Sequence, residues 1–200
     1  AKDGAVSLDR CEGMWAFAFF DETNGSLLLS RDRFGEKPVY YGWHKGVFLF
    51  ASELKALRAA PGFDPEIDPR SLQEYFRWTY LPAPLTIYEG VRKLPSAHFL
   101  RMDSESAKCS VQPYWSAAET MESTPSRSCG ADAVECLGEV LDRAVAAQMV
   151  ADVPLGAFLS GGIDSSSVVA SMQRHSSVPI QTFTVGFSES DYDESRYAAE

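Results

Sequence analysis

The sequence predicts a mixed α+β domain followed by the opening of a parallel α/β domain, and three observations carry this prediction. Short apolar strands bounded by turn residues fill the first part, beginning with residues 15–20 before the pair Asn24-Gly25. Apolar residues at helical spacing begin at Val134. A glycine pair at 161–162 then joins a short strand to a helix, which is typical of a parallel sheet.

Two hairpins are expected in the first domain. Residues 15–20 are apolar at every position, so we expect this strand to be covered on both of its faces. The strand that returns after Asn24-Gly25 occupies residues 27–30. The apolar runs 39–41 and 47–50 flank a turn that contains Gly46, and they predict the second hairpin.

Two helices are expected after the hairpins. Ser52 precedes a run of helix-forming residues, so we expect its side chain to cap a short helix. Asp68 and Pro69 open another helix, because proline is tolerated at the first helical position. This second helix is expected to run to about Tyr80, where two prolines follow.

A change of composition divides the chain. Serine, threonine, glutamate and proline dominate residues 116–129, which bury little apolar area and are typical of a linker. We therefore predict a first domain at residues 1–115 and a second at 130–200. The chain begins with Ala1 and stops at Glu200 within an expected helix, so we expect an internal segment of a longer protein.

Composition excludes several classes of function. The formal net charge of −10 argues against nucleic-acid binding, which needs a basic patch. There is no run of about 18 apolar residues, so no membrane span is predicted. No apolar signal segment is visible at the N-terminus. The cysteines lack the spacing of a zinc site or a disulfide framework, so we expect reduced thiols and a cytoplasmic protein. They are Cys11, Cys109, Cys129 and Cys136.

The turn after the strand at 153–159 predicts a phosphate-binding loop. Gly161 and Gly162 let the backbone approach a phosphate closely. The unpaired N–H groups and the dipole of the following helix favour an anion. Ser160 and Ser165 add hydroxyl donors, whereas the carboxylate that follows them would repel a phosphate unless it holds Mg²⁺.

That carboxylate belongs to Asp164, the expected metal ligand. The sequence from Ser160 to Ser165, Ser-Gly-Gly-Ile-Asp-Ser, lacks the lysine of a Walker A loop. It resembles the pyrophosphate loop of the ATP pyrophosphatase family, which cleaves ATP between its α and β phosphates. The resemblance implies a doubly wound adenine-nucleotide-binding domain in which Phe158 and Val185 border the adenosine, although the family usually has leucine at position 158. The alternative is a plain strand-to-helix turn with these two side chains in the core.

Four segments of the first domain carry a second resemblance. Residues 13–19, 31–38, 51–57 and 88–95 resemble, in order and spacing, the latter half of the class II glutamine amidotransferase domain. This implies part of an α+β N-terminal-nucleophile hydrolase sandwich. Followed by the pyrophosphate loop, the combination resembles the asparagine synthetase family from about Leu8 to the end of the chain, apart from the linker.

The resemblance implies an ATP- and Mg²⁺-dependent enzyme with glutamine, aspartate and ATP as substrates. In that family glutamine supplies ammonia, and the aspartate side chain is adenylated before ammonia displaces AMP. A homodimer is a further expectation. The nucleophile is an N-terminal cysteine whose own α-amino group is the base. Ala1 cannot take this role, and the later synthetase residues lie beyond Glu200. We therefore name no catalytic residue and expect the chain alone to be inactive.

The remaining polar residues are expected to be structural. The charged run 31–37 is expected to be structural and not catalytic, and the side chains of Arg31, Asp32 and Arg33 can pair with one another. Cys11 precedes a core strand and is expected to be structural, as is His98. His44 lies in a hairpin and is expected to be exposed.

Three other readings stay open. A β-lactam synthetase, or an amidotransferase that modifies a polysaccharide or peptide, would share both domains and differ in its acceptor. An ATP pyrophosphatase without glutaminase activity would lack the first-domain motifs. A non-catalytic remnant that binds a nucleotide or a partner would account for the missing nucleophile.

Overall fold

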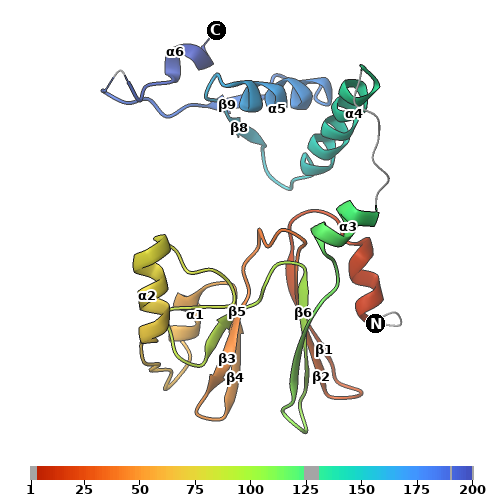
Figure 1. Cartoon of the computed structure of the whole chain (residues 1–200). Coiled ribbons are helices and arrows are strands. Elements are labelled where there is room, and N and C mark those ends of the chain that lie inside the picture. The colour runs from red at the N-terminus through yellow and green to blue at the C-terminus, as the bar shows by residue number, and fades with distance from the viewer. Residues whose placement is uncertain (1–3, 124–130, 190, 200) are drawn as a thin grey trace. The chain divides into compact units, whose positions relative to one another are not determined.

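The computed structural model describes residues 4–123, 131–189 and 191–199. The chain divides into two compact units, Ala1–Thr124 and Pro125–Glu200, which are described separately (Figure 1). Both units mix helices and strands, as predicted at that level. In the described part of the chain, no helix combines the length and apolar character that crossing a membrane requires.

Unit 1 contains two antiparallel sheets (Figure 1). One has the strand order β1-β2-β6-β7 and the other β4-β3-β5. The two predicted hairpins are confirmed as β1-β2 and β3-β4. The strands are β1 (Ala16–Asp21), β2 (Ser26–Arg31), β3 (Tyr40–His44), β4 (Val47–Ala51), β5 (Val91–Lys93), β6 (His98–Asp103) and β7 (Cys109–Pro113).

Helices of unit 1 lie before the strands, between β4 and β5, and after the strands. Helix α2 begins at Pro69, as predicted, and the Asp68 side chain caps it by accepting a hydrogen bond from the Arg70 amide at 3.0 Å. The predicted Ser52 cap is wrong: the N-cap residue is Glu53, whose side chain makes no capping hydrogen bond. Helix α3 forms inside the segment predicted as a linker. The helices are η1 (Gly4–Arg10), α1 (Leu54–Arg58), α2 (Pro69–Trp78) and α3 (Ala117–Ser123).

The core of unit 1 joins its two sheets. A cluster of buried apolar residues includes Leu29 and Leu100 from the first sheet and Tyr41 from the second. The expectation that β1 is covered on both faces is wrong, since Phe17 is 38% and Phe19 44% exposed. β1 is the edge strand of its sheet, and its outer face borders an open cavity instead of a packed layer.

Unit 2 follows the predicted helix, strand, turn, helix and strand. β8 pairs with β9 in parallel, with Phe158 opposite Phe183, which confirms the predicted parallel arrangement. An ion pair between Arg174 and Asp142 joins α5 to α4. The elements are α4 (Ala131–Gln148), β8 (Gly156–Phe158), α5 (Ile163–Arg174), β9 (Gln181–Phe183) and α6 (Ser195–Ala198).

Candidate functional site

The predicted phosphate loop connects β8 to α5. Gly161 has φ +79°, a left-handed conformation that glycine adopts without strain. Gly162 is the N-cap residue of α5, with φ −71° and ψ 158°, and the helix begins at Ile163, directly after the glycine pair. The turn therefore aims the first amides of α5 at the space beyond the carboxyl end of β8.

Two serine hydroxyls lie side by side in this loop. The oxygen atoms Oγ of Ser160 and Ser165 are 3.0 Å apart. The Ser160 amide donates to Ser165 Oγ at 3.3 Å, and the Gly162 amide donates to Ser160 Oγ at 3.3 Å. These backbone contacts are long for hydrogen bonds, so a stronger acceptor such as a phosphate oxygen could replace them.

Other loop amides have no acceptor at all. Within the described residues, the N–H groups of Gly161, Ile163 and Asp164 make no hydrogen bond, as the geometry of a helix start dictates. The dipole of α5 adds partial positive charge at the same place. This end of α5 can therefore bind an anion through backbone donors.

A cavity of about 250 Å³ adjoins the loop. It brings together four of the predicted site residues, while Gly161, Gly162 and Asp164 are not part of its wall. The Leu159 amide donates to Phe183 O at 2.9 Å and the Thr184 hydroxyl to Leu159 O at 2.6 Å, so the strand ends are held together beneath it. The wall consists of Phe158, Leu159, Ser160, Ser165, Phe183, Thr184, Val185, Phe187 and Glu194.

Asp164 is exposed in the first turn of α5. Across the described ranges, no group of three or more His, Cys, Asp and Glu side chains could hold a metal ion. Magnesium bound to a nucleotide needs only one or two protein carboxylates, because phosphates and water complete its shell. A single carboxylate beside the loop therefore fits Mg²⁺ that arrives with phosphates.

The charged loop of unit 1 is built around Asp32, which is 1% exposed. Its carboxylate accepts from the amides of Phe34 at 3.1 Å, Glu36 at 3.0 Å and Lys37 at 3.0 Å, and from Trp15 at 3.4 Å. Burial by itself would raise the pKa of Asp32, but the backbone hydrogen bonds outweigh it and hold the pKa below its ordinary value.

Arg31 is fixed in a similar way. Its guanidinium donates to the backbone oxygens of Lys37 at 2.8 Å and Leu94 at 2.7 Å, and to that of Gly35. The run is structural, as predicted. The predicted pairing of its side chains is wrong, because the charged groups of Arg31 and Asp32 bond backbone atoms instead.

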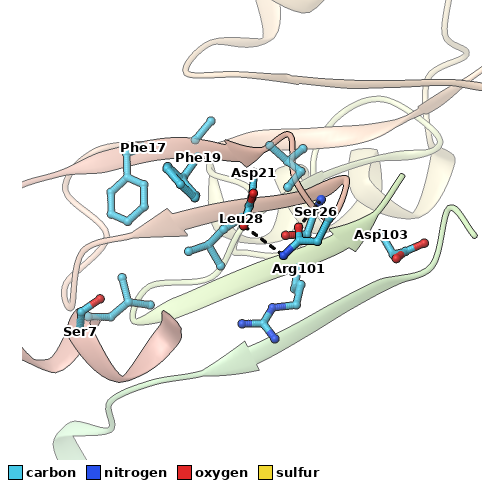
Figure 2. Close-up of a pocket in the computed structure, with 12 residues that line it drawn as sticks. Ser7, Phe17, Phe19, Asp21, Ser26, Leu28, Arg101 and Asp103 are labelled. Atoms are coloured by element: carbon cyan, nitrogen blue, oxygen red, sulfur yellow. Dashed lines mark hydrogen bonds between the residues drawn. The ribbon is translucent and has the colours of Figure 1, made fainter. Parts of the chain in front are cut away.

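A cavity of about 550 Å³ lies on the outer face of β1, β2 and β6. Figure 2 shows Phe17 and Phe19 of β1 beside Leu28 of β2, with Asp21 and Asp103 near its edge. No cysteine or histidine lines it. This cavity was not predicted, because the continuous apolar residues of β1 indicated a strand that is covered on both faces.

Cys11, His98 and His44 each have a local partner in unit 1. Cys11 Sγ lies 3.6 Å from Ser7 O, and His98 Nδ1 lies 2.7 Å from Ser96 O. The expectation that His44 is merely exposed is wrong. Its ring is half-buried, and its Nε2 atom lies 2.8 Å from the backbone oxygen of Gly62.

Comparisons with known proteins match both units. Residues 1–115 match the family "Glutamine amidotransferase domain", and residues 137–200 match "Asparagine synthase". The chain is 36% identical to a protein of Methanocaldococcus jannaschii provisionally named as a glutamine-hydrolysing asparagine synthetase, over 92% of the chain and 36% of that protein. It is 33% identical to asparagine synthetase 3 of Bacillus subtilis, over 92% of the chain and 30% of the relative. The chain thus spans about a third of the length of these relatives.

Proposed function

We propose a function from one premise: this chain belongs to the glutamine-hydrolysing asparagine synthetase family. In our proposal the whole protein converts aspartate to asparagine with glutamine as the nitrogen donor. ATP adenylates the aspartate side chain, β-aspartyl-AMP forms and pyrophosphate leaves. Ammonia then displaces AMP. The observation that carries the proposal is the open anion-binding turn at residues 160–165, which follows an amidotransferase domain in the same chain.

The loop's own residues suit this chemistry. The amides of Gly161, Ile163 and Asp164 are placed to donate to phosphate oxygens, and the paired hydroxyls of Ser160 and Ser165 add donors beside them. Asp164 would hold Mg²⁺, which supplies positive charge to the departing pyrophosphate.

The cavity next to the loop suits the nucleoside. Phe158 and Val185 give it an apolar wall, on which an adenine ring can pack, while the serines lie where the phosphates would be. In this proposal unit 2 is the start of a doubly wound domain, whose nucleotide lies beyond the carboxyl ends of parallel strands.

Unit 1 would then be part of the N-terminal-nucleophile sandwich that releases ammonia from glutamine. The matches to 1–115 and 137–200 support a boundary at a linker near 116–129, with the second domain from about residue 130. Small-molecule substrates, a cytoplasmic location and a homodimer belong to the same proposal.

The test is aspartate-dependent exchange of pyrophosphate into ATP by the full-length protein. Asp164→Asn should abolish exchange and leave glutamine hydrolysis largely intact, because the two reactions use different domains. Asp152→Asn is a matched control, since Asp152 is also exposed and lies before β8 outside the loop. Equal loss of both activities in the Asp164 variant would indicate a folding defect and contradict the assigned role.

A second candidate is amide formation on an acceptor other than aspartate. Relatives of this chain are not all named asparagine synthetases: one from Gibberella zeae, 34% identical over 86% of the chain and 25% of that protein, is named an amidase. Exchange that does not depend on aspartate would favour this candidate, and a strict aspartate requirement would exclude it.

A further inference from the structure

An exposed acidic residue in the wall of the candidate nucleotide cavity has no partner within the described residues. Glu194 lines the cavity together with Phe158, Val185 and the two loop serines. Within the described residues, its side chain makes no hydrogen bond and no ion pair. It is the one acidic residue in a wall that is otherwise apolar or carries hydroxyl groups. Such a group is available to a ligand.

The neighbouring helix places this carboxylate close to the phosphate loop. A Cβ atom added to Gly161 would lie 2.5 Å from the carbonyl carbon of Tyr197, so α6 packs directly on the loop. The Tyr197 amide donates to the Glu194 backbone oxygen at 3.0 Å. Glu194 is therefore one helical turn from the contact with the loop.

The turn before α6 is fixed as well. Asp193 Oδ1 accepts from the Ser195 amide at 3.1 Å. This bond orders the backbone on both sides of Glu194 and limits the directions that its side chain can take. The backbone at Glu194 is thus held in place beside the cavity that this residue lines.

The chemistry of the cavity selects the ligand group. Phosphates belong at the amides of the loop, and a carboxylate near them would repel a phosphate. A nucleobase belongs on the apolar wall. The neutral hydroxyls of the ribose connect these two parts, and one carboxylate can accept from both members of a vicinal diol. Acidic residues bind ribose hydroxyls in this way in other nucleotide-binding folds.

We propose that Glu194 binds the 2′ and 3′ hydroxyls of the nucleotide's ribose, and so selects ribonucleotides. This inference rests on the proposed function, since it needs a nucleotide in the cavity. Glu194 has no part in the chemical step, and its contribution is to affinity and specificity.

The experiment is calorimetric titration of the full chain with ATP, 2′-deoxy-ATP, 3′-deoxy-ATP and tripolyphosphate, all with Mg²⁺. Wild type should bind ATP about tenfold more tightly than either deoxynucleotide, because each deoxynucleotide lacks one hydrogen bond to a charged acceptor. Glu194→Ala should weaken ATP binding by about tenfold or more and abolish the preference for ATP over the deoxynucleotides. Its affinity for tripolyphosphate should equal that of wild type. Glu194→Gln keeps one acceptor oxygen, so its affinity for ATP should lie between those of wild type and Glu194→Ala.

Glu189→Gln is the matched control. It removes the same charge from the same loop, but Glu189 lies outside the cavity wall, where it accepts from the Ser188 hydroxyl at 2.8 Å. It should bind every ligand as wild type does.

Three results would overturn the inference. Equal binding of ATP and the deoxynucleotides by wild type would show that no ribose hydroxyl is bound. Parallel weakening of ATP and tripolyphosphate by Glu194→Ala would show that Glu194 only supports the loop. Failure of wild type to bind either ATP or tripolyphosphate would overturn the proposed function, and the inference with it.

Discussion

The two polar turns of this chain, one in each unit, differ in whether their backbone N–H groups have acceptors. Each turn contains a glycine with positive φ, Gly35 in unit 1 and Gly161 in unit 2. In unit 1 the Asp32 carboxylate accepts from four backbone amides. In unit 2 the amides of Gly161, Ile163 and Asp164 make no hydrogen bond within the described residues.

The difference shows how an aspartate decides the role of a turn. Asp32 points into its own turn and is buried, so the turn is complete without a ligand. Asp164 lies one residue inside a helix and is exposed, so it leaves the amides open. The first turn stabilises the fold, and the second is available to a phosphate. The predictions below test this contrast, from the largest expected effect to the smallest.

Adding a methyl group to the unit 2 turn at Gly161 should have the largest effect, a loss of nucleotide affinity. Gly161→Ala adds strain at φ +79° and places a Cβ atom 2.5 Å from the backbone of Tyr197. We expect nucleotide affinity to fall by about a hundredfold, the factor that roughly 3 kcal/mol of strain would cause. Titration with ATP and Mg²⁺ measures this.

Gly138→Ala is the control for that variant, since Gly138 lies within α4 and a Cβ atom there meets no atom within 4 Å. It should bind nucleotide normally and gain up to about 1 kcal/mol of stability from the higher helix propensity of alanine. Normal nucleotide binding by Gly161→Ala would contradict the geometry of the loop.

Replacing the Asp32 carboxylate in the unit 1 turn should lower the stability of the fold and leave nucleotide binding unchanged. Asp32→Asn replaces an acceptor oxygen by an NH₂ group that faces backbone donors, so we expect the free energy of unfolding of unit 1 to fall by roughly 2 kcal/mol. Denaturant unfolding measures it. Glu36→Gln, which keeps the Glu36 amide, should change stability by less than about 0.5 kcal/mol. A loss of nucleotide binding in Asp32→Asn would show that this turn is not purely structural.

Acid should remove the same stabilisation. The pKa of Asp32 is held below its ordinary value in the folded chain, so its contribution is present above the unfolded pKa of about 3.9 and is lost as pH falls through the folded pKa. The stability difference between wild type and Asp32→Asn should therefore be constant near neutral pH and narrow below about pH 4. Unfolding curves from pH 6 to pH 3 test this, and a difference that widens in acid would contradict it.

Removing the Ser165 hydroxyl from the unit 2 turn should have the smallest effect, a modest loss of nucleotide affinity. Ser165→Ala deletes one donor, and about 1 kcal/mol for a single hydrogen bond corresponds to a roughly fivefold loss of affinity. Ser166→Ala is the control, because Ser166 is exposed and lies outside the cavity wall. An equal loss in the two variants would show that the hydroxyl pair is not part of the site.

Much of the fold was predictable because its signals are local. The pair Asn24-Gly25 marks a hairpin, and Asp68 before Pro69 marks a helix start, whatever lies elsewhere in the chain. The parallel pairing of β8 with β9 followed from a glycine turn that leads into a helix. In each case a few neighbouring residues determine the backbone path.

Features that depend on distant partners were not predictable. The apolar pattern of β1 could not reveal that the strand lies at a sheet edge beside a cavity. The hydrogen-bond partners of Asp32 could not be predicted without the conformation of its loop, since they are backbone amides and not the arginine side chains that were expected. Glu194 was not predicted as a site residue, because its place in the cavity wall depends on the packing of α6 on the phosphate loop.

Amide hydrogen exchange, with and without ATP and Mg²⁺, tests the contrast between the two turns most directly. Without ligand, the amides of Glu36 and Lys37 should exchange slowly, and those of Gly161, Ile163 and Asp164 rapidly. With ligand, the account predicts slower exchange at the second set alone. Unchanged exchange at residues 161–164, or slowing confined to residues 34–37, would contradict the claim that the unit 2 turn is the phosphate site.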